Sequence, residues 1–225
     1  MTSGGTVLLV PVLRRPRNVA PLVRSVRENT PEPHRILFLA TTGDLEEIAA
    51  IRDAGADLLE VPPYPRGDYA RKINAGYRAS SEPFLFLGAD DLAFHPGWLP
   101  AALELMADPA IGVVGTQDLA PTERARTGQH ATHSLVRRSY VDERGTIDRR
   151  GEVLHPGYWH EYVDNELVET ARHRGAFAFA FGSVVEHLHP SWGKAPTDEL
   201  YAQQRRRMSH GRALFARRRR LWTSR

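Results

Sequence analysis

Short apolar runs alternate with amphipathic stretches through the first 90 residues of the chain. Runs of strand length occupy residues 6–13, 35–40, 57–61 and 84–87. Apolar residues between the runs recur at helical spacing, most clearly at Val19, Leu22, Val23 and Val26. Asn18, Asp44 and Asp68 stand where the helices should begin, and we predict them as N-caps. This alternation predicts right-handed βαβ units and a mostly parallel central sheet flanked by helices.

The pattern becomes less regular after residue 91. Further strands are predicted over residues 111–115, 134–136 and 176–186, and further helices over residues 96–106, 165–174 and from Thr197 onward. Polar loops are expected over residues 121–128 and 142–151. Neither an internal repeat nor a clear linker interrupts the chain. We therefore predict a single Rossmann-like α/β domain over residues 1–196, with residues 197–225 forming a basic helical extension packed on it or trailing from it.

Composition narrows the class of protein. Hydrophobic residues make up 41% of the 225 residues, enough for a sizeable core, and no run of 18 apolar residues predicts a transmembrane helix. Cysteine is absent, which excludes disulfides, thiolate metal sites and cysteine nucleophiles. Residues 1–5 lack the basic and apolar regions of a signal peptide. These features favour a cytoplasmic enzyme.

Charge is concentrated at the C-terminal end. Residues 201–225 contain nine Arg and no Asp or Glu; because the whole chain is +3 and this segment is +9, residues 1–200 carry −6. The segment fits three roles: contact with nucleic acid, contact with an anionic membrane surface as a basic amphipathic helix, or a solvated helix end. Its apolar residues also allow docking on a partner; they are Leu214, Phe215, Leu221 and Trp222.

Two adjacent carboxylates, Asp90 and Asp91, follow the apolar run 84–87. Like charges side by side repel each other unless something positive lies between them. The carboxyl ends of strands in open α/β sheets are also where ligands bind. The pair is therefore a candidate cation site, and the alternative is that both residues cap the next turn.

Four segments in this order resemble the GT-A glycosyltransferases, and the family 2 type most closely. They are the proline-containing turn at residues 10–12, the helix at 69–77 with its Ala-Arg-Lys-Ile-Asn-Ala-Gly sequence, the pair Asp90–Asp91, and Val-Asp-Asn-Glu-Leu at 163–167. The resemblance covers roughly residues 6–190 and implies a GT-A fold. It also implies transfer of a sugar, expected to be a hexose, from a nucleotide-diphosphate sugar to an unknown acceptor. The chain departs from the family at Gly88 and Val163, where the family often has acidic residues. Residues 40–44 also lack the usual acidic residue that reads the nucleotide base just after the second strand.

The resemblance implies a divalent cation, Mn²⁺ or Mg²⁺, held by Asp91 with Asp90. Hard oxygen ligands suit both ions, and Mn²⁺ also tolerates one imidazole. His187 and His189 are candidates for that imidazole; they would face the same side of an extended segment, and His187 is preferred because it adjoins the apolar run. The alternative is a histidine whose hydrogen bonds are satisfied within the protein.

The resemblance also assigns roles to residues around the cation. Asp164 is the candidate general base for an inverting transfer, with Glu166 second; the alternative is that Asp164 caps a helix beginning near Asn165. The candidates for binding the nucleotide-sugar are Pro11, Arg71, Lys72, Asn74, Asp90 and Lys194. The candidates for the acceptor side are Trp159, His160 and Trp192.

Other functions compete with this interpretation. A sugar-1-phosphate nucleotidylyltransferase would need a glycine-rich loop after the first strand, whereas Gly4 and Gly5 precede it. A nucleic-acid-binding module, or a glycosyltransferase acting on modified DNA bases, would use the basic extension, but the acidic remainder of the chain speaks against nucleic acid. The pattern does not indicate an oligomeric state.

Overall fold

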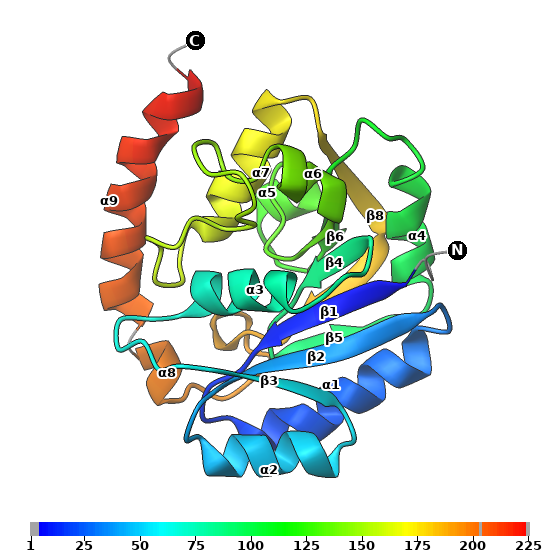
Figure 1. Cartoon of the computed structure of the whole chain (residues 1–225), viewed down its shortest axis with the longest axis vertical. Helices are drawn as coiled ribbons and strands as arrows, with labels where there is room; N and C mark the ends of the chain where they lie inside the picture. Colours follow the sequence, from blue (N-terminus) through cyan, green and yellow to red (C-terminus); the bar gives the residue numbers. More distant parts are fainter. Residues whose placement is uncertain (1–4, 203, 224–225) are drawn as a thin grey trace.

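The computed structural model describes residues 5–202 and 204–223, without the side chains of residues 200, 202 and 204–207 (Figure 1). The described residues form one eight-stranded sheet in the order β3-β2-β1-β4-β7-β6-β8-β5. The strands are β1 (Thr6–Pro11), β2 (His34–Thr41), β3 (Asp57–Val61), β4 (Phe84–Leu87), β5 (Leu92–Phe94), β6 (Val113–Gln117), β7 (Ser134–Arg137) and β8 (Phe177–His187). The helices are α1 (Pro16–Asn29), α2 (Leu45–Asp53), α3 (Tyr69–Arg78), α4 (Trp98–Leu105), α5 (Glu123–Arg126), α6 (Arg138–Glu143), α7 (Val163–His173), α8 (Glu199–Ala202) and α9 (Gln204–Thr223), with a 3-10 turn, η1, at Pro190–Trp192.

The first half of the sheet confirms the alternating pattern. Strands β3, β2, β1 and β4 are neighbours and all run parallel. In the second half β6 and β8 are also parallel to each other, but β7 runs antiparallel to both β4 and β6, and β5 runs antiparallel to β8. The predicted α/β fold with a mostly parallel sheet is confirmed. Strand β5 was not predicted, because three residues are too few to show a periodicity.

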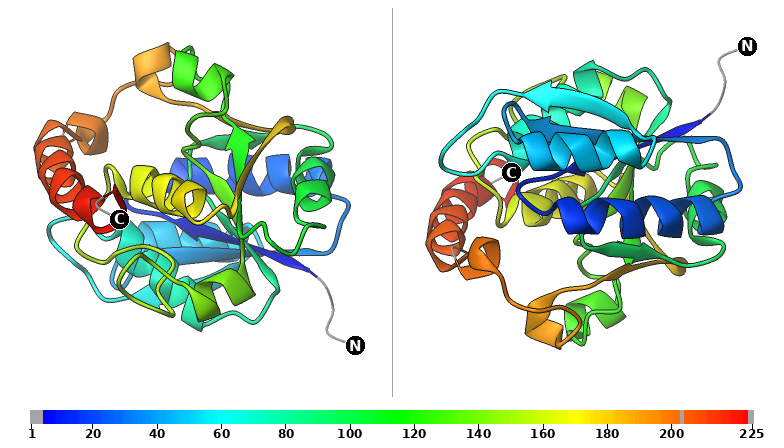
Figure 2. Two further views of the ribbon diagram at one scale, coloured as in Figure 1. Left: turned by 90° about the horizontal axis from the view of Figure 1, so that it is seen from above. Right: turned by 90° about the horizontal axis from the view of Figure 1, so that it is seen from below.

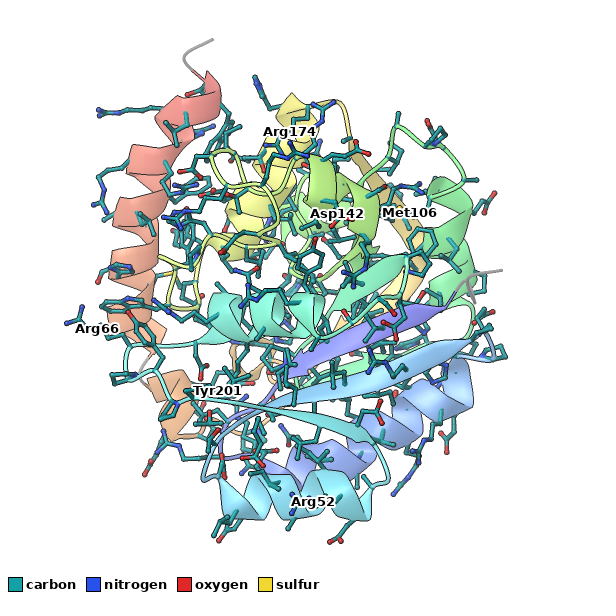
Figure 3. The ribbon with its side chains drawn as sticks, in the orientation of Figure 1. Arg52, Arg66, Met106, Asp142, Arg174 and Tyr201 are labelled. Carbon is teal, nitrogen blue, oxygen red and sulfur yellow. The ribbon has the colours of Figure 1, made fainter. Side chains whose placement is uncertain are left out.

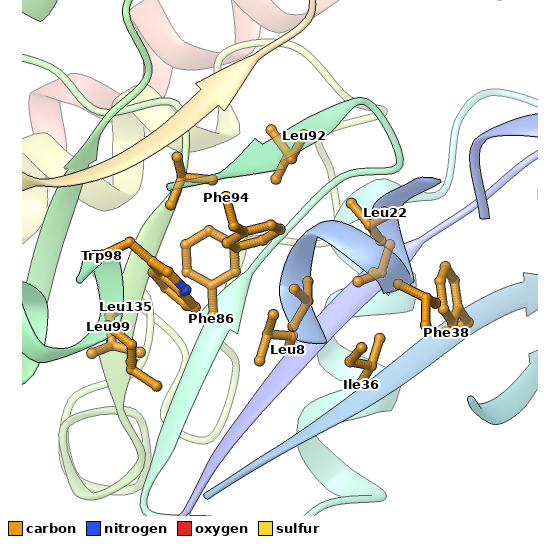
Figure 4. Close-up of a cluster of buried hydrophobic side chains, with 14 of the residues drawn as sticks. Leu8, Leu22, Ile36, Phe38, Phe86, Leu92, Phe94, Trp98, Leu99 and Leu135 are labelled. Carbon is orange, nitrogen blue, oxygen red and sulfur yellow. The ribbon is translucent and has the colours of Figure 1, made fainter. Parts of the chain in front are cut away.

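Apolar residues on both faces of the central strands are buried. On one face, Leu8, Phe38 and Phe86 pack with α1, α2 and α4, and Figure 4 shows Phe86 beside Phe94 and Trp98. On the other face, Leu9 and other residues of β1, β2 and β4 pack with α3 and α7. Figure 2 shows the helices on opposite sides of the sheet. Burial on both faces explains why these strands are continuous apolar runs rather than alternating ones.

One of the three predicted N-caps, Asn18, does not stand at the start of its helix. Helix α1 begins at Pro16, with Arg15 as its N-cap, and proline is well tolerated at the first position of a helix. Asn18 therefore lies inside the helix. Asp44 and Asp68 do precede α2 and α3, but neither side chain makes a capping hydrogen bond. Asp44 instead accepts a hydrogen bond from the backbone N–H of Arg14 at 2.9 Å. A tertiary contact thus takes the Asp44 carboxylate, whereas Asp68 pairs with Lys72 one turn away in α3, at 3.1 Å.

The basic extension forms α9, which lies along one side of the domain (Figure 1) and contacts α7. Arg218 is 8% exposed and is paired with Glu166 and Asp148, each at 2.7 Å, and Trp222 is buried. The description of this segment as a solvated helix end is therefore wrong for these two residues, although Arg217, Arg219 and Arg220 are exposed. The side chains of the predicted basic run 205–207 lie outside the described residues.

Within residues 5–202 and 204–223, the longest helices are too polar or too short to cross a membrane.

Candidate active site

A cavity of about 390 Å³ opens at the edge of the sheet where β1, β4 and β8 end. Strand β7 begins at the same edge because it runs antiparallel to β4. The residues lining the cavity are Pro11, Val12, Leu13, Arg15, Gly67, Asp68, Tyr69, Lys72, Ala89, Asp90, Asp91, Thr132, His133, His160, Glu161, Val163, Asp164, His187, His189, Ser191, Trp192 and Tyr201. Its volume and its mixture of apolar and charged walls are typical of a small-molecule site.

Asp90 and Asp91 lie at the base of this cavity. One oxygen of each carboxylate, Oδ2 of Asp90 and Oδ1 of Asp91, is buried and has no hydrogen-bond partner among the described residues. Burial, together with the charge of Asp91, raises the pKa of Asp90 above its usual range. Burial would also raise the pKa of Asp91, but hydrogen bonding to His187 and the charge of that imidazole lower it. A buried acceptor pair with two unused oxygens is the arrangement that a cation stabilises.

His187 is the histidine that approaches the carboxylates. Its Nε2 lies 3.4 Å from Oδ2 of Asp91. His189 also lines the cavity, but its Nδ1 accepts a hydrogen bond from the backbone N–H of Ser191 at 3.1 Å. The structure thus separates the two candidates that the extended segment left equivalent, and it places His187 beside the aspartates as preferred.

Asp164 lines the cavity as well, on α7. Its Oδ2 accepts a hydrogen bond from Nε2 of His130 at 3.1 Å, and its Oδ1 accepts one from the backbone N–H of Asn165 at 2.9 Å. Burial would raise the pKa of Asp164, but the hydrogen bond and charge of His130 lower it. Burial would lower the pKa of His130, and Asp164 raises it instead. Asp164 is therefore an ionised carboxylate supported by an imidazole, in the first turn of α7 rather than at its N-cap.

Glu166 lies away from the cavity, which corrects its prediction as a second candidate base. It is 3% exposed, and its carboxylate accepts hydrogen bonds from the Tyr158 hydroxyl at 2.8 Å and from Arg218 at 2.7 and 2.8 Å. All these contacts are inside the protein, so Glu166 holds α9 against α7 and has no access to a substrate hydroxyl.

Lys72 reaches the cavity wall but is not free to bind a diphosphate. Its ammonium bonds the Val12 carbonyl at 2.7 Å and the Thr41 hydroxyl at 2.8 Å, and it pairs with Asp68 at 3.1 Å. An ammonium has three protons, and these three acceptors use them all. Burial lowers the pKa of Lys72 despite the charge of Asp68. The role supported by these contacts is to tie α3 to the ends of β1 and β2.

Three other predicted donor-side residues do not line the cavity. The guanidinium of Arg71 stacks 4.0 Å over the Tyr64 ring. The side chain of Asn74 is buried and bonds Glu152 together with the backbone of Val153 and Leu154, between 2.7 and 3.1 Å. Lys194 pairs with Glu186 at 2.7 Å. These contacts correct the three predictions, because each side chain is used in holding neighbouring segments together. Pro11, another residue predicted to bind the nucleotide-sugar, does line the cavity.

Of the three aromatic residues predicted on the acceptor side, two line the cavity and one does not. His160 and Trp192 line the cavity, and His160 packs against Tyr69 with ring centroids 5.1 Å apart. Trp159 instead stacks on His210 of α9, with centroids 3.8 Å apart and an interplanar angle of 5°. Trp159 therefore fastens α9 to the domain.

Sequence reasoning missed Arg15 and the segment that follows η1. The Arg15 guanidinium lies 3.2 Å from Asp90 and 3.7 Å from Asp91, and Asp198 accepts two hydrogen bonds from it at 2.8 and 3.0 Å. It also lies 4.2 Å over the ring of Tyr201, which is labelled in Figure 3 and whose hydroxyl donates a hydrogen bond to Asp91. Asp198 and Tyr201 are more than 180 residues from Arg15 along the chain, so no local pattern predicts their contact. The one signal in the sequence is that Arg15 lies just after the first strand.

His133 was also missed. It precedes β7, is 3% exposed, and its Nδ1 lies 3.1 Å from the Leu87 carbonyl. Its Nε2 is buried with no hydrogen-bond partner among the described residues. Burial first, and then the charge of His187, lower the pKa of His133 to about 4, so the ring is neutral at physiological pH. Nothing in the sequence near His133 distinguishes it from a core histidine.

The donor set at the base of the cavity fits a divalent cation. Two unused carboxylate oxygens and one nearby imidazole are ligands that Mn²⁺ accepts, and the oxygens alone suit Mg²⁺. Across the described part of the chain, no three carboxylate or imidazole groups converge at metal-binding distances. A cation at this place would therefore take its remaining ligands from bound substrate or water.

Comparisons with known proteins agree with this geometry. The sequence model of glycosyl transferase family 2 matches residues 7–161, more than half of the chain. The structure is similar to that of glucosyl-3-phosphoglycerate synthase from Mycobacterium tuberculosis, solved with Mn²⁺, UDP and glucosyl-3-phosphoglycerate (17% identity, TM-score 0.63, 95% of this chain and 79% of that one). It is also similar to a mannosyltransferase from Pyrobaculum calidifontis, solved with GDP-mannose and Mn²⁺ (16% identity, TM-score 0.68, 96% of this chain and 64% of that one). At these identities the likeness establishes the GT-A fold. No curated protein matches the chain.

Proposed function

This chain belongs to glycosyl transferase family 2, and on that basis we propose that it transfers a sugar from a nucleotide-diphosphate sugar to an acceptor hydroxyl with the help of Mn²⁺ or Mg²⁺. One observation carries the proposal. The cavity holds a buried carboxylate pair with two unused oxygens together with Asp164, an ionised carboxylate on another element. The first group is suited to hold a cation, which would in turn bind the diphosphate, and the second is suited to accept a proton.

Asp91 and Asp90 are the residues that would hold the cation, and His187 lies beside them, 3.4 Å from Asp91. Bound there with a diphosphate, the cation would neutralise the negative charge that develops on the leaving group. Arg15 adds a fixed positive charge at the same place, since its guanidinium lies 3.2 Å from Asp90. The protein therefore supplies both the ligands for the cation and a second positive charge near the expected position of the diphosphate.

Asp164 is the proposed general base. Its carboxylate accepts the proton of the acceptor hydroxyl as that oxygen forms its bond to the anomeric carbon of the sugar. The bond from this carbon to the diphosphate oxygen breaks in the same step, and the diphosphate leaves with the electron pair. His130, at 3.1 Å, holds the carboxylate in position and stabilises its ionised form.

The rest of the cavity suits a nucleotide-sugar and its acceptor. Pro11 ends β1 at the cavity edge, where it would contact the nucleotide, while His160 and Trp192 present rings on which a sugar would stack. The similar solved structures hold UDP and GDP-mannose, so we propose a UDP- or GDP-hexose as the donor. A nucleic-acid-binding module and a transferase for modified DNA bases have less support, because the similar solved structures hold a nucleotide, a nucleotide-sugar and glucosyl-3-phosphoglycerate.

The first experiment is a thermal-shift panel of UDP-, GDP-, CDP- and dTDP-sugars, each with and without Mn²⁺. A ligand that binds only the folded protein raises the melting temperature by mass action. We expect a Mn²⁺-dependent shift with one nucleotide class. No shift with any donor, from protein that melts cooperatively, would overturn the proposal.

Variants then assign the roles. Asp91→Asn should abolish the Mn²⁺-dependent shift, whereas Asp164→Asn should retain donor binding and lose turnover by about two to four orders of magnitude, the typical contribution of a general base. Asp57→Asn is the matched control, since this carboxylate is 57% exposed on β3, far from the cavity lining. Full turnover by both test variants would mean that these aspartates are not the catalytic and metal-binding residues.

A further inference from the structure

We propose that His133 accepts a hydrogen bond, through Nε2, from a hydroxyl group of the donor sugar and so helps to select that sugar. The proposal rests on the proposed function. It starts from the position of the ring: Ser134 pairs with Leu87 in the antiparallel register of β7 and β4, so His133 lies just beyond the end of β4, next to the turn that leads to Asp90. From there it lines the cavity while remaining almost fully buried.

The hydrogen bond to Leu87 determines which nitrogen of His133 carries the proton. A carbonyl oxygen only accepts, so the contact at 3.1 Å requires a hydrogen on Nδ1. With the hydrogen on Nδ1, Nε2 is the nitrogen that carries the lone pair of the imidazole. A buried acceptor without a partner is costly, and Nε2 of His133 is such an acceptor among the described residues.

The missing partner must be a hydrogen-bond donor. A phosphate oxygen at neutral pH has little hydrogen to offer and its charge would face a lone pair, whereas a sugar hydroxyl donates readily. The ring lies against that of His187, which contacts Asp91, and it lines the same cavity as Asp164. In the proposed reaction the donor sugar is bonded to the diphosphate held at Asp91 and is attacked from the side of Asp164. A hydroxyl that reaches His133, beside His187 and in the same cavity as Asp164, is therefore assigned to the donor sugar.

A metal-ligand role for His133 fits the geometry less well. Its ring meets that of His187 edge-on, with centroids 5.2 Å apart, and its Nδ1 already donates to the Leu87 carbonyl. The two roles also predict different losses on mutation. A sugar contact affects only ligands that contain the sugar, whereas a metal ligand affects every ligand that binds through the cation.

The test compares nucleotides with nucleotide-sugars. Affinities for UDP, GDP, UDP-glucose and GDP-mannose, each with Mn²⁺, are measured by calorimetry for the wild-type protein, His133→Asn and His133→Gln. Asn can keep a donor for the Leu87 carbonyl while losing the Nε2 lone pair, and Gln can place an amide oxygen near the position of Nε2. We expect His133→Asn to bind the nucleoside diphosphate as the wild type does and to lose about 3- to 30-fold in affinity for the matching nucleotide-sugar. His133→Gln should recover part of this loss.

The outcomes are distinguishable. Equal nucleotide-sugar affinity in the wild type and His133→Asn would overturn the assignment. Equal losses for the diphosphate and the nucleotide-sugar would also overturn it and would identify His133 as a metal ligand. No Mn²⁺-dependent binding by the wild type would overturn the proposed function and this inference with it. Where the assignment holds, deoxy derivatives of the bound sugar name the hydroxyl, since only its removal makes the wild type and His133→Asn equal.

Discussion

Replacing Arg218 with Met should destabilise the protein by removing the charge that joins α9 to the rest of the domain. The guanidinium makes two hydrogen bonds to Glu166, at 2.7 and 2.8 Å, and two to Asp148, at 2.7 and 2.9 Å. Met retains much of the aliphatic length of Arg but none of its hydrogen bonds. The perturbation therefore leaves one buried carboxylate, Glu166, with the Tyr158 hydroxyl as its remaining described partner.

The magnitude follows from the unequal burial of the two carboxylates. Breaking a buried ion pair by removing one partner costs about 3–5 kcal/mol, because the other charge stays desolvated. Glu166 is in this situation. Asp148 is 41% exposed, so solvent screens its charge and its share of the loss is small. We expect a loss of about 3 kcal/mol, which for a chain of this size lowers the melting temperature by roughly 6–12 °C.

The assay is thermal unfolding at pH 7, with Arg217→Met as the control because Arg217 lies one residue away on the exposed side of α9. Hydrogen bonding to Arg218 lowers the pKa of Asp148 from 3.8 to about 2. A carboxyl group with a depressed pKa in the folded state stabilises the protein above pH 3.8, and this stabilisation is lost as the pH falls toward 2. The Arg218→Met protein should lack that part of the acid dependence. Equal melting temperatures for the two variants would refute the reasoning and would mean that α9 contributes nothing through this pair.

Three further predictions concern the cavity and its surroundings. Asp164→Asn should lower the pKa of His130, measured by NMR titration, because the charge that raises it is removed; an unchanged pKa would contradict the pairing. Tyr201→Phe should tighten Mn²⁺ binding to the ligand-free protein by about 3- to 10-fold in calorimetry, because the cation no longer competes with the hydroxyl for Asp91; weaker binding would mean that Tyr201 assists the cation. Gly67→Ala should destabilise the protein by about 1–3 kcal/mol more than Gly43→Ala in thermal unfolding. Both glycines have positive φ, but only at Gly67 would a Cβ lie 2.6 Å from a backbone oxygen, that of Trp159. Equal losses would show that the backbone moves freely there.

The parallel half of the sheet was predictable because its information is local. Strands buried on both faces must be apolar, and helices between them must be apolar on one side, so both leave a period in the sequence. The reversal of β7 leaves no such period, because a strand has the same alternation in either direction. It is a property of the chain path, and it is what brings His133 to the edge where β4 ends.

The candidate site, like the fold, was predictable only where the information is local. Asp90, Asp91 and Asp164 were found because each directly follows or opens a regular element, and the structure places all three in one cavity. Polar residues of the helix at 69–77 looked equally suitable, yet Lys72 and Asn74 are used in internal hydrogen bonds. Whether a polar group is free for a ligand depends on all the groups that surround it, and most of those are distant in sequence.

The sequence by itself determined the fold class and the place where the chemistry is expected, because apolar period and strand ends are read from neighbouring residues. Only the tertiary structure decided which polar groups remain unpaired. It took Glu166 and Lys72 into internal pairs and brought Arg15 and Tyr201 onto the aspartates. It also left Nε2 of His133 with no hydrogen-bond partner in the part of the chain that the structure describes. The physical reason is that a buried polar group is satisfied or left unsatisfied by contacts in space, which local sequence patterns do not record.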